Sequence, residues 1–325
     1  MTLKIAILDD YQNVAMTLAD WGKLGHDVTV TVFNTNFGTE DEAADTLREF
    51  DVLCMMRERM ALPAALIDRL PNLKLVSVTG ARVRVIDLNH ATSKGITICH
   101  TYAGDSAHAT PEIAWGLILA CARFIPQEHG RVQHGGWQET IGTKLGGKTI
   151  GIVGLGKLGS RMARIAQAFE MNVIAWSQNL TAERAAEHGA RLVDKHTLFA
   201  EADVVSLHLI LSDRTRHIVA GPEINQMKSQ AILINTSRGP LIDEGALLSA
   251  LHQSRIRAGL DVFDVEPLPT GHPLRNAPNC VLSPHLGYVT QEAYTKFYAD
   301  TVDNILAWRA QAPVRVLAAP TIAGK

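Results

Sequence analysis

Apolar runs and helix-like stretches alternate along the first hundred residues. The apolar runs predict strands at residues 4–8, 28–33, 52–56, 73–78 and 96–98. Between them, residues 40–49 and 63–70 have apolar positions at helical spacing. This alternation predicts an α/β domain with a parallel sheet.

A second series of strands begins near Lys148. The apolar runs place these strands at residues 149–153, 173–176, 204–209, 232–235, 258–262 and 281–283. They predict a second α/β domain. The last helix-like segment, residues 291–308, follows the final strand, and we expect it to return to the first domain. Residues 101–290 would then be inserted in a discontinuous domain of residues 1–100 and 291–325.

Composition excludes several classes of protein. The chain has 325 residues, 46% of them hydrophobic and 20% charged, which suffices for two cores. The formal net charge is -2, so the chain has no excess of positive charge that would attract nucleic acid or an anionic membrane. The longest apolar stretch, residues 113–125, contains Arg123 and is shorter than the roughly 20 residues of a membrane span. It predicts a buried helix.

The chain begins with a predicted strand and has no signal-peptide pattern, so we expect a cytoplasmic protein. The cysteines lack C-x-x-C spacing and predict buried thiols in a reducing compartment, without disulfides or zinc. They are Cys54, Cys99, Cys121 and Cys280. His129 and His134 lack the spacing of a helical pair of metal ligands, so we predict no metal.

A glycine-rich loop stands between the strand at residues 149–153 and a helix predicted over residues 161–169. In that context the first glycine permits a tight turn, the second lets the backbone approach a pyrophosphate, and the third lets helix and strand pack closely. The pattern predicts a Rossmann-type domain that binds a dinucleotide. We assign to the cofactor Gly154, Gly156, Lys157, Leu158 and Gly159.

The next strand ends at Ser177. An acidic residue commonly stands there in NAD-binding domains and binds the adenosine ribose. Serine lacks the carboxylate that would repel the 2′-phosphate of NADP, and no arginine follows directly. We assign Ser177 to the cofactor and interpret Arg184 as a solvated helix residue. The choice between NAD and NADP stays open.

Arg238, Glu266 and His285 each follow a predicted strand, at the edge where open α/β sheets bind ligands. A guanidinium can pair with a substrate carboxylate through two hydrogen bonds. An imidazole can exchange a proton with a ketone oxygen while hydride moves at the carbon, and a carboxylate on its other nitrogen fixes the tautomer. Each residue alone is more often structural. Together they predict a hydride-transfer site.

Longer segments resemble the D-isomer-specific 2-hydroxyacid dehydrogenase family. The resemblance is specific in the second domain and weaker in the first. It rests on the glycine loop 154–159, residues 235–247 (NTSRGPLIDEGAL), 259–267 (GLDVFDVEP), 272–274 (HPL) and 284–287 (PHLG), and residues 71–74, 86–88 and 95–96. The expected fold class is α/β with two doubly wound parallel-sheet domains, the Rossmann-type cofactor domain being inserted in a flavodoxin-like substrate domain.

The resemblance implies an oxidoreductase that moves hydride between NAD or NADP and a small 2-oxo acid or D-2-hydroxy acid. It implies that Arg238 binds the substrate, that Glu266 supports His285, and that His285 is the acid/base. It further implies that Thr236 contacts the cofactor and that Asp261 holds the nicotinamide amide. A helix near residues 112–123 is implied to form a homodimer interface.

In the first domain the resemblance implies that three consecutive residues cradle the substrate carboxylate. They are Thr79, Gly80 and Ala81. Three arginines follow first-domain strands and are predicted either to help bind an acidic substrate or to remain solvated. They are Arg57, Arg59 and Arg82.

An alternative function is a cofactor-sensing interaction protein of the same fold, similar to a corepressor. The lack of long disordered or basic extensions argues against it. Because the chain ends at Lys325, we expect no appended regulatory domain. The chain departs from the family at Ile210, where a proline is frequent.

Overall fold

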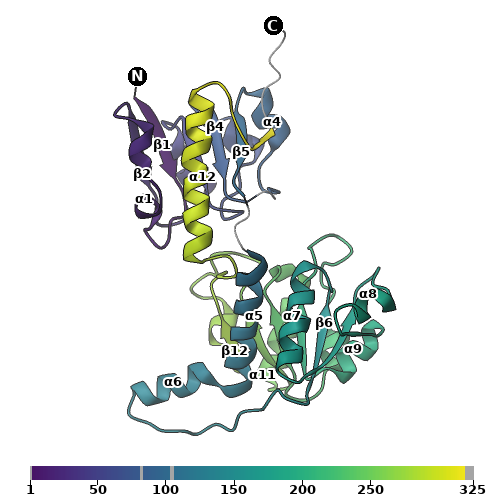
Figure 1. Ribbon diagram of the computed structural model, residues 1–325. Helices are drawn as coiled ribbons and strands as arrows, with labels where there is room; N and C mark the ends of the chain where they lie inside the picture. Colours follow the sequence, from purple (N-terminus) through teal and green to yellow (C-terminus); the bar gives the residue numbers. More distant parts are fainter. Residues whose placement is uncertain (1, 81–82, 103–105, 319–325) are drawn as a thin grey trace. The chain divides into compact units, whose positions relative to one another are not determined.

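A computed structural model describes residues 2–80, 83–102 and 106–318 (Figure 1). The chain divides into two compact units. One consists of residues 1–105 and 290–325, and the other of residues 106–289. The domain boundaries predicted from the sequence differ from the boundaries of these units by a few residues. Each unit contains a mainly parallel sheet, which confirms the predicted fold class.

The sheet of the first unit has five parallel strands in the order β2-β1-β3-β4-β5. This is the flavodoxin-like order. A further strand, β13, pairs antiparallel with β5 at the edge, and the sequence analysis missed it because three residues carry no pattern of their own. The strands are β1 (Leu3–Ile7), β2 (Val28–Val32), β3 (Val52–Met55), β4 (Leu75–Val78), β5 (Thr97–His100) and β13 (Val316–Ala318).

Helix α12 (Gln291–Arg309) packs against β4 and β5, so the last helix does return to the first unit. Its residue Asn304 is fully buried and donates to Ser77 Oγ at 2.9 Å and to the His100 carbonyl oxygen at 3.1 Å. These bonds satisfy a polar side chain that would otherwise be costly to bury. The other helices of this unit are α1 (Ala15–Leu18), η1 (Trp21–Leu24), α2 (Glu40–Leu47), α3 (Ala64–Ile67) and α4 (Leu88–Ser93).

The sheet of the second unit has seven parallel strands in the order β12-β11-β10-β9-β6-β7-β8. Its core is the Rossmann arrangement, in which the strand order reverses beside β6. The two-residue strand β8 is absent from the prediction. The strands are β6 (Thr149–Val153), β7 (Asn172–Trp176), β8 (Arg191–Leu192), β9 (Val204–Leu207), β10 (Ile232–Asn235), β11 (Arg257–Leu260) and β12 (Cys280–Leu282).

The strand register puts the carboxyl ends of five strands of this sheet at one level. The aligned residues are Val153, Leu207, Asn235, Leu260 and Leu282. The residues that follow them therefore lie side by side along one edge. This edge carries the glycine loop and the three loops predicted to hold the catalytic residues.

Helices cover both faces of the second sheet. Apolar residues of α5 and α7 pack in the hydrophobic core on one face of the sheet. Apolar residues of α9, α10 and α11 pack in the core on the other face (Figure 1). The helices are α5 (Ser106–Arg123), α7 (Lys157–Ala168), α8 (Ala182–Ala186), α9 (Lys195–Glu201), α10 (Gly221–Gln226) and α11 (Glu244–His252). Two 3-10 helices, η2 (Gly239–Leu241) and η3 (Pro273–Asn276), lie in the loops at the edge.

The buried helix predicted over residues 113–125 ends earlier than expected. Helix α5 ends at Arg123, and Phe124 has a left-handed φ of 53°. The buried Arg257 donates to the Cys121 carbonyl oxygen at 3.0 Å. Its guanidinium carbon lies 4.6 Å from the centroid of the Phe124 ring. Ile125 begins a separate helix, α6 (Ile125–Gln133), and is 53% exposed.

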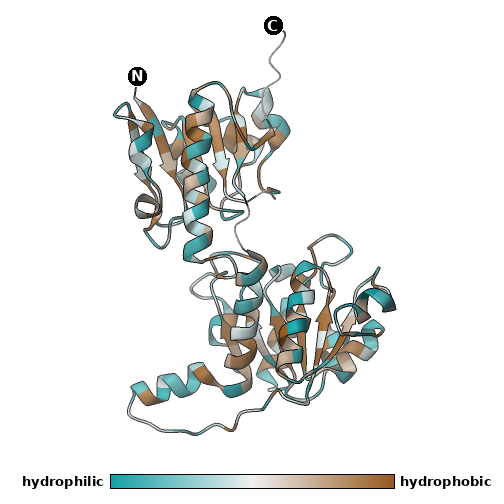
Figure 2. Cartoon of the chain, in the orientation of Figure 1, coloured by the Kyte–Doolittle hydropathy of each residue, from teal (hydrophilic) through white to brown (hydrophobic). Residues whose placement is uncertain are grey.

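Figure 2 shows that the strands of both sheets are mostly apolar and that the helices carry polar outer positions. This is the distribution expected when helices cover a parallel sheet on both faces. Within the described residues, no helix combines the length and the apolar character that crossing a membrane requires.

Candidate active site

The glycine loop after β6 has the steric features that a dinucleotide requires. Gly154 has φ 99°, and a Cβ there would lie 2.8 Å from the His208 carbonyl oxygen. A Cβ on Gly159 would lie 2.1 Å from the Gly154 carbonyl oxygen. Beside Gly156, by contrast, a Cβ would meet no heavy atom of the described residues within 4 Å. The outer glycines permit close packing, and the middle one borders open space, as the approach of a pyrophosphate to the backbone requires.

Helix α7 begins directly after Gly156, with Lys157 exposed and Leu158 half-buried in its first turn. Its first backbone N–H groups therefore lie at the open side of the loop, where they can bind an anion. Ser177 follows β7 and is half-buried, and its carbonyl oxygen accepts a hydrogen bond from the Leu180 N–H at 3.1 Å. The residues predicted to bind the cofactor thus lie at the ends of two adjacent strands.

Arg238 follows β10 in a loop that is bonded internally. The Asn235 side chain donates to the Arg238 carbonyl oxygen at 2.8 Å and accepts from the Ser237 N–H at 3.0 Å. Nη1 of Arg238 donates to the Ser237 carbonyl oxygen at 2.7 Å. Gly239 presses this loop against the next one, because a Cβ on it would lie 2.1 Å from the Phe263 carbonyl carbon. The close contact joins the Arg238 loop to the loop that leads to Glu266.

Glu266 and His285 form a direct pair. Nδ1 of His285 and Oε2 of Glu266 are 2.5 Å apart, and both side chains are about one third exposed, at 30% and 32%. The other carboxylate oxygen, Oε1, accepts from the Phe263 N–H at 2.9 Å. With Nδ1 bonded to the carboxylate, Nε2 is the nitrogen that can exchange a proton with a substrate. Tyr288 packs its ring edgewise against the imidazole, with centroids 5.3 Å apart.

The pKa of Glu266 lies below its ordinary value. Burial alone would raise this pKa, but the hydrogen bond and charge of His285, the Phe263 N–H and the charge of Arg238 outweigh burial and lower it. The carboxylate therefore contributes stability that is present above the pKa of an unfolded glutamate and is lost as the pH falls through the lower pKa of the folded protein. At neutral pH the group facing His285 is negatively charged.

Asp261, at the end of β11, holds the loop that carries His285. Its carboxylate is fully buried and accepts from Ser283 Oγ at 2.6 Å and from the N–H groups of Leu286 and Gly287 at 2.7 and 2.8 Å. Burial raises the pKa of Asp261 in spite of these bonds. The contact with a nicotinamide amide that the resemblance implies stays a prediction. In the described structure this carboxylate positions the histidine loop.

The residues predicted to cradle the substrate carboxylate belong to the first unit. The Thr79 N–H donates to the Met55 carbonyl oxygen at 2.9 Å, and the Gly80 N–H donates to Thr101 Oγ1 at 3.0 Å. Ala81 lies outside the described residues. A Cβ on Gly80 would lie 2.0 Å from Nη1 of Arg57, so this guanidinium lies against the Gly80 backbone. Their role toward the substrate stays a prediction.

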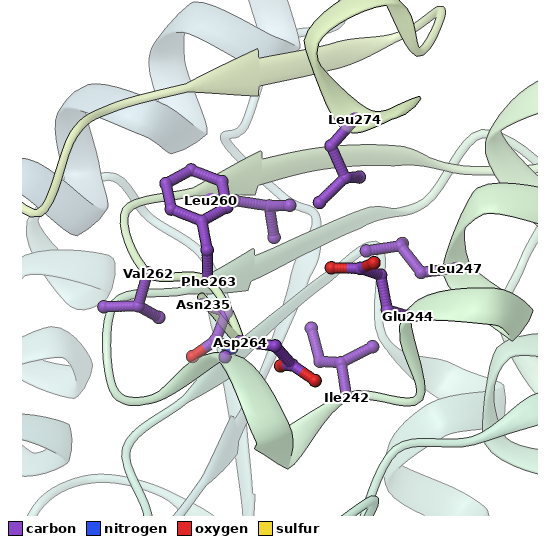
Figure 3. A pocket seen from close by; sticks show the side chains of 10 residues that line it. Asn235, Ile242, Glu244, Leu247, Leu260, Val262, Phe263, Asp264 and Leu274 are labelled. Atoms are coloured by element: carbon purple, nitrogen blue, oxygen red, sulfur yellow. The ribbon is translucent and has the colours of Figure 1, made fainter. Parts of the chain in front are cut away.

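A cavity of about 10 Å³ lies behind the junction of the Arg238 and Glu266 loops (Figure 3). Its lining includes Gly239, Glu244, Phe263 and Leu274. A space of that size holds about one water molecule and no substrate. Within the described residues, no group of three histidine, cysteine or acidic side chains is arranged to hold a metal ion.

Several residues that shape the site were not identified from the sequence. Asn235, Ser283 and Phe263 act through hydrogen bonds to loop backbone or to a neighbouring carboxylate. Each stands two or three residues before Arg238, His285 or Glu266, and this proximity was the available signal. The partner of Ser283, however, is Asp261, which follows another strand and cannot be deduced from neighbours in the sequence.

Comparison with known proteins gives consistent results. The sequence model described as the D-isomer specific 2-hydroxyacid dehydrogenase, NAD binding domain, matches residues 115–287. The chain is 38% identical over 275 residues to a glyoxylate reductase of Aeropyrum pernix, covering 79% of this chain and 82% of that protein. It is similar in structure to the phosphoglycerate oxidoreductase of Vibrio cholerae, with TM-score 0.89, 37% identity, and coverage of 96% of this chain and 100% of the other.

The chain is also 38% identical over 259 residues to a D-3-phosphoglycerate dehydrogenase of Methanocaldococcus jannaschii. That match covers 78% of this chain but 49% of the other protein. The chain therefore spans about half the length of this relative.

The contact between Gly239 and Phe263 predicts the effect of Gly239→Ala. The added methyl group collides with backbone, so we expect the free energy of unfolding to fall by about 1–3 kcal/mol. The Arg238 and Glu266 loops should separate, and turnover should fall with them. Chemical denaturation and steady-state kinetics measure both effects. The control is Gly271→Ala, where a Cβ would meet none of the described heavy atoms within 4 Å. A Gly239→Ala protein as stable and active as the control would contradict the prediction.

Proposed function

This chain belongs to the D-isomer specific 2-hydroxyacid dehydrogenase family, and we propose that it reduces small 2-oxo acids to D-2-hydroxy acids with NADH or NADPH, or catalyses the reverse reaction. The observation that carries the proposal is the pair of His285 and Glu266, whose ring nitrogen and carboxylate oxygen are 2.5 Å apart. The pair lies on the same edge of the sheet as the glycine loop. A proton donor and a cofactor cradle on one edge are what hydride transfer to a carbonyl requires.

A nicotinamide cofactor, when bound along this edge, would supply or accept the hydride. The residues that would hold the cofactor are those of the glycine loop, Ser177 and Thr236. In the reductive direction Nε2 of His285 gives its proton to the substrate carbonyl oxygen, and in the oxidative direction it takes that proton back. Glu266 holds the ring through Nδ1 and stabilises the positive charge that the imidazole carries before it gives the proton.

Arg238 binds the substrate carboxylate in this proposal. Its guanidinium can form two parallel hydrogen bonds to a carboxylate, and its charge acts on Glu266 from nearby. The reaction then requires a substrate with a carboxylate next to a carbonyl carbon, which is the definition of a 2-oxo acid. Glyoxylate, hydroxypyruvate and pyruvate are the first substrates to test.

The relatives compared above are all named as enzymes. This favours the dehydrogenase over the alternative of a cofactor-sensing interaction protein, and no feature of the described residues favours the alternative. We also propose a cytoplasmic location. All four cysteines are free within the described residues, which agrees with a reducing compartment.

For the cofactor we propose that both NADH and NADPH are accepted. Ser177 is followed by two exposed amides, Gln178 and Asn179, so no carboxylate stands at this strand end to repel a 2′-phosphate. No arginine follows directly to attract one either. Arg184 is exposed in α8, beside the equally exposed Glu183. The local charge therefore favours neither cofactor strongly.

We propose a homodimer in which a second copy covers the arm formed by α6 and residues 134–145. In the described structure, α6 has no buried residue, and Figure 1 shows it leading away from the sheet of its unit. The arm exposes Trp137 at 73% and Ile141 at 93%. It is nevertheless held in shape, because Glu128 accepts from the Thr140 N–H at 2.8 Å and from Thr140 Oγ1 at 2.6 Å. Exposed apolar side chains on a segment with a fixed conformation are typical of a surface that another chain covers.

The function predicts the effect of His285→Ala. We expect turnover of a 2-oxo acid to fall by about 10² to 10⁴, because general acid catalysis is lost, while the dissociation constant for NADH stays the same. Loss of the absorbance of the reduced cofactor measures turnover, and cofactor fluorescence measures binding. His252→Ala, an exposed histidine of α11, is the control. Full activity of His285→Ala would remove this residue from the mechanism, and wild-type protein that binds NADH but reduces no 2-oxo acid would overturn the function itself.

The cofactor assignment predicts the effect of Ser177→Asp. A carboxylate at this strand end should weaken NADPH binding by about tenfold or more through repulsion of the 2′-phosphate, and leave NADH binding unchanged. Titration of both cofactors by fluorescence gives the two dissociation constants. Asn172→Asp adds the same charge at the opposite end of β7 and should change neither. Equal effects of both substitutions would mean that Ser177 does not lie near the 2′ position.

The dimer proposal predicts the effect of Ile141→Asp. A charge on this fully exposed apolar side chain should prevent the arm from being covered, so the variant should have the mass of one chain where the wild type has the mass of two. Size-exclusion chromatography with light scattering measures the mass. Met16→Asp, on the first unit and 48% exposed, should leave the dimer intact. A dimeric Ile141→Asp would exclude the arm as the interface.

A further inference from the structure

The loop after β11 contacts the chain that follows β10 at two places. The first is the contact of Gly239 with the Phe263 carbonyl group. The second lies farther along the loop, where Nε2 of His272 is 3.2 Å from Oε1 of Glu244 in the first turn of α11. Gly239, Phe263 and Glu244 line the same cavity of about 10 Å³ (Figure 3). The two contacts therefore border one small space behind the candidate site.

Both ring nitrogens of His272 have a partner. Nδ1 accepts a hydrogen bond from the Leu274 N–H at 3.3 Å, at the start of η3. Because Nδ1 is the acceptor here, a neutral ring carries its proton on Nε2 and presents it to Glu244. The two side chains are 19% and 28% exposed. Since neither nitrogen is left to exchange a proton with a substrate, the geometry favours a positioning role.

The segment between Glu266 and His272 is bonded to the residues that follow it. The Arg275 guanidinium donates to the carbonyl oxygens of Leu268 and Pro269, at 2.5 and 2.7 Å. The His272 N–H donates to the same Pro269 oxygen at 3.0 Å. A displacement of His272 would therefore reach the residues directly after Glu266.

We infer that His272 and Glu244 form a positioning pair that keeps the Glu266 carboxylate at His285. The Phe263 N–H, three residues earlier in the same loop, donates to Glu266 Oε1. That bond fixes the carboxylate relative to its own loop but does not fix the loop. The inference rests on the proposed function, because it explains how the proposed acid/base keeps its partner.

Helix α11 provides the fixed point. Its residues Leu247 and Leu251 are buried in the core of the second unit. Asp243 caps the helix by accepting from the Ala246 N–H at 3.0 Å. Glu244 lies in the first turn, where the helix dipole favours a negative charge. A loop that contacts this carboxylate is therefore held against a packed helix.

Loosening the loop should change how His285 titrates. A carboxylate at Nδ1 stabilises the protonated ring, so the ring should lose its proton at a lower pH once Glu266 moves away. Asp261, Arg238 and Tyr288 also act on the ring or on the pair, and no substitution at residue 244 or 272 alters them. The titration of His285 thus reports the position of Glu266.

The test measures the pH midpoint of the His285 titration by NMR of the free, full-length protein, with His285→Ala to assign the signals. The variants are Glu244→Ala and His272→Asn. Asparagine can still cap the Leu274 N–H but is too short to reach Glu244, so His272→Asn removes the contact and keeps the cap. Chemical denaturation measures the stability of each variant.

Two further variants are the references. Glu266→Gln shows the effect of losing the carboxylate at His285. Glu223→Ala is the matched control, because Glu223 also lies in the first turn of a helix, α10, and bonds to Lys195 at 2.8 Å. It should lower stability without moving the midpoint.

We expect Glu244→Ala and His272→Asn each to lower the midpoint by about half a pH unit, and by less than Glu266→Gln does. Glu244→Gln keeps an oxygen for the Nε2 proton and should stay near the wild type. Combining Glu244→Ala with Glu266→Gln should give the shift of Glu266→Gln alone, because the pair acts through Glu266. Turnover should fall by about threefold to tenfold in Glu244→Ala, with the dissociation constant for NADH unchanged.

Additive shifts in the double variant would overturn the inference, since the pair would then act on His285 by another route. An unchanged midpoint in both Glu244→Ala and His272→Asn would also overturn it, whatever the effect on stability. If Glu244→Ala fails to fold, His272→Asn decides alone. The NMR measurement needs no turnover, so wild-type protein that shows the expected shifts but reduces no 2-oxo acid would contradict the proposed function and not the positioning pair.

Discussion

The buried carboxylate of Asp261 is the interaction on which the candidate site depends. It ties the end of β11 to the loop after β12 by accepting bonds from Ser283, Leu286 and Gly287. His285 lies within that loop at a left-handed φ of 55°, a conformation that costs energy for any residue other than glycine. The three bonds offset this cost. They also hold the imidazole within reach of Glu266, and proton transfer depends on such a fixed distance.

Close approach of one backbone to another joins the separate loops. Gly239 brings the Arg238 loop onto the Phe263 carbonyl group, and the N–H of the same residue donates to Glu266. Gly154 brings the cofactor loop onto the backbone of His208. A side chain at either glycine would hold the two loops apart. The guanidinium, the carboxylate and the imidazole thus share one edge because glycines allow their loops to touch.

Polar side chains determine where the helices of both units end or dock. Asn304 on α12 bonds to β4 and β5, which returns the last helix to the first sheet. Arg257 on β11 bonds to the last turn of α5, next to the left-handed Phe124. The chain turns there, and α6 extends outward with Ile141 and Trp137 exposed on the arm that follows. The arm that we propose a second copy covers therefore begins where the buried helix ends.

The parallel strands and the glycine loop could be predicted from the sequence, because apolar runs and glycine spacing are local patterns. The strands predicted at residues 149–153 and 232–235 have the same bounds as β6 and β10. The sequence also singled out Arg238, Glu266 and His285, since each follows a strand. The strands β8 and β13, the exposure of Ile125 and the bonds of Asp261 to the histidine loop became evident in the folded chain alone. The physical reason is the same in each case: short strands, helix ends and buried carboxylates are stabilised by partners far away in the sequence, and a local pattern contains no information about those partners.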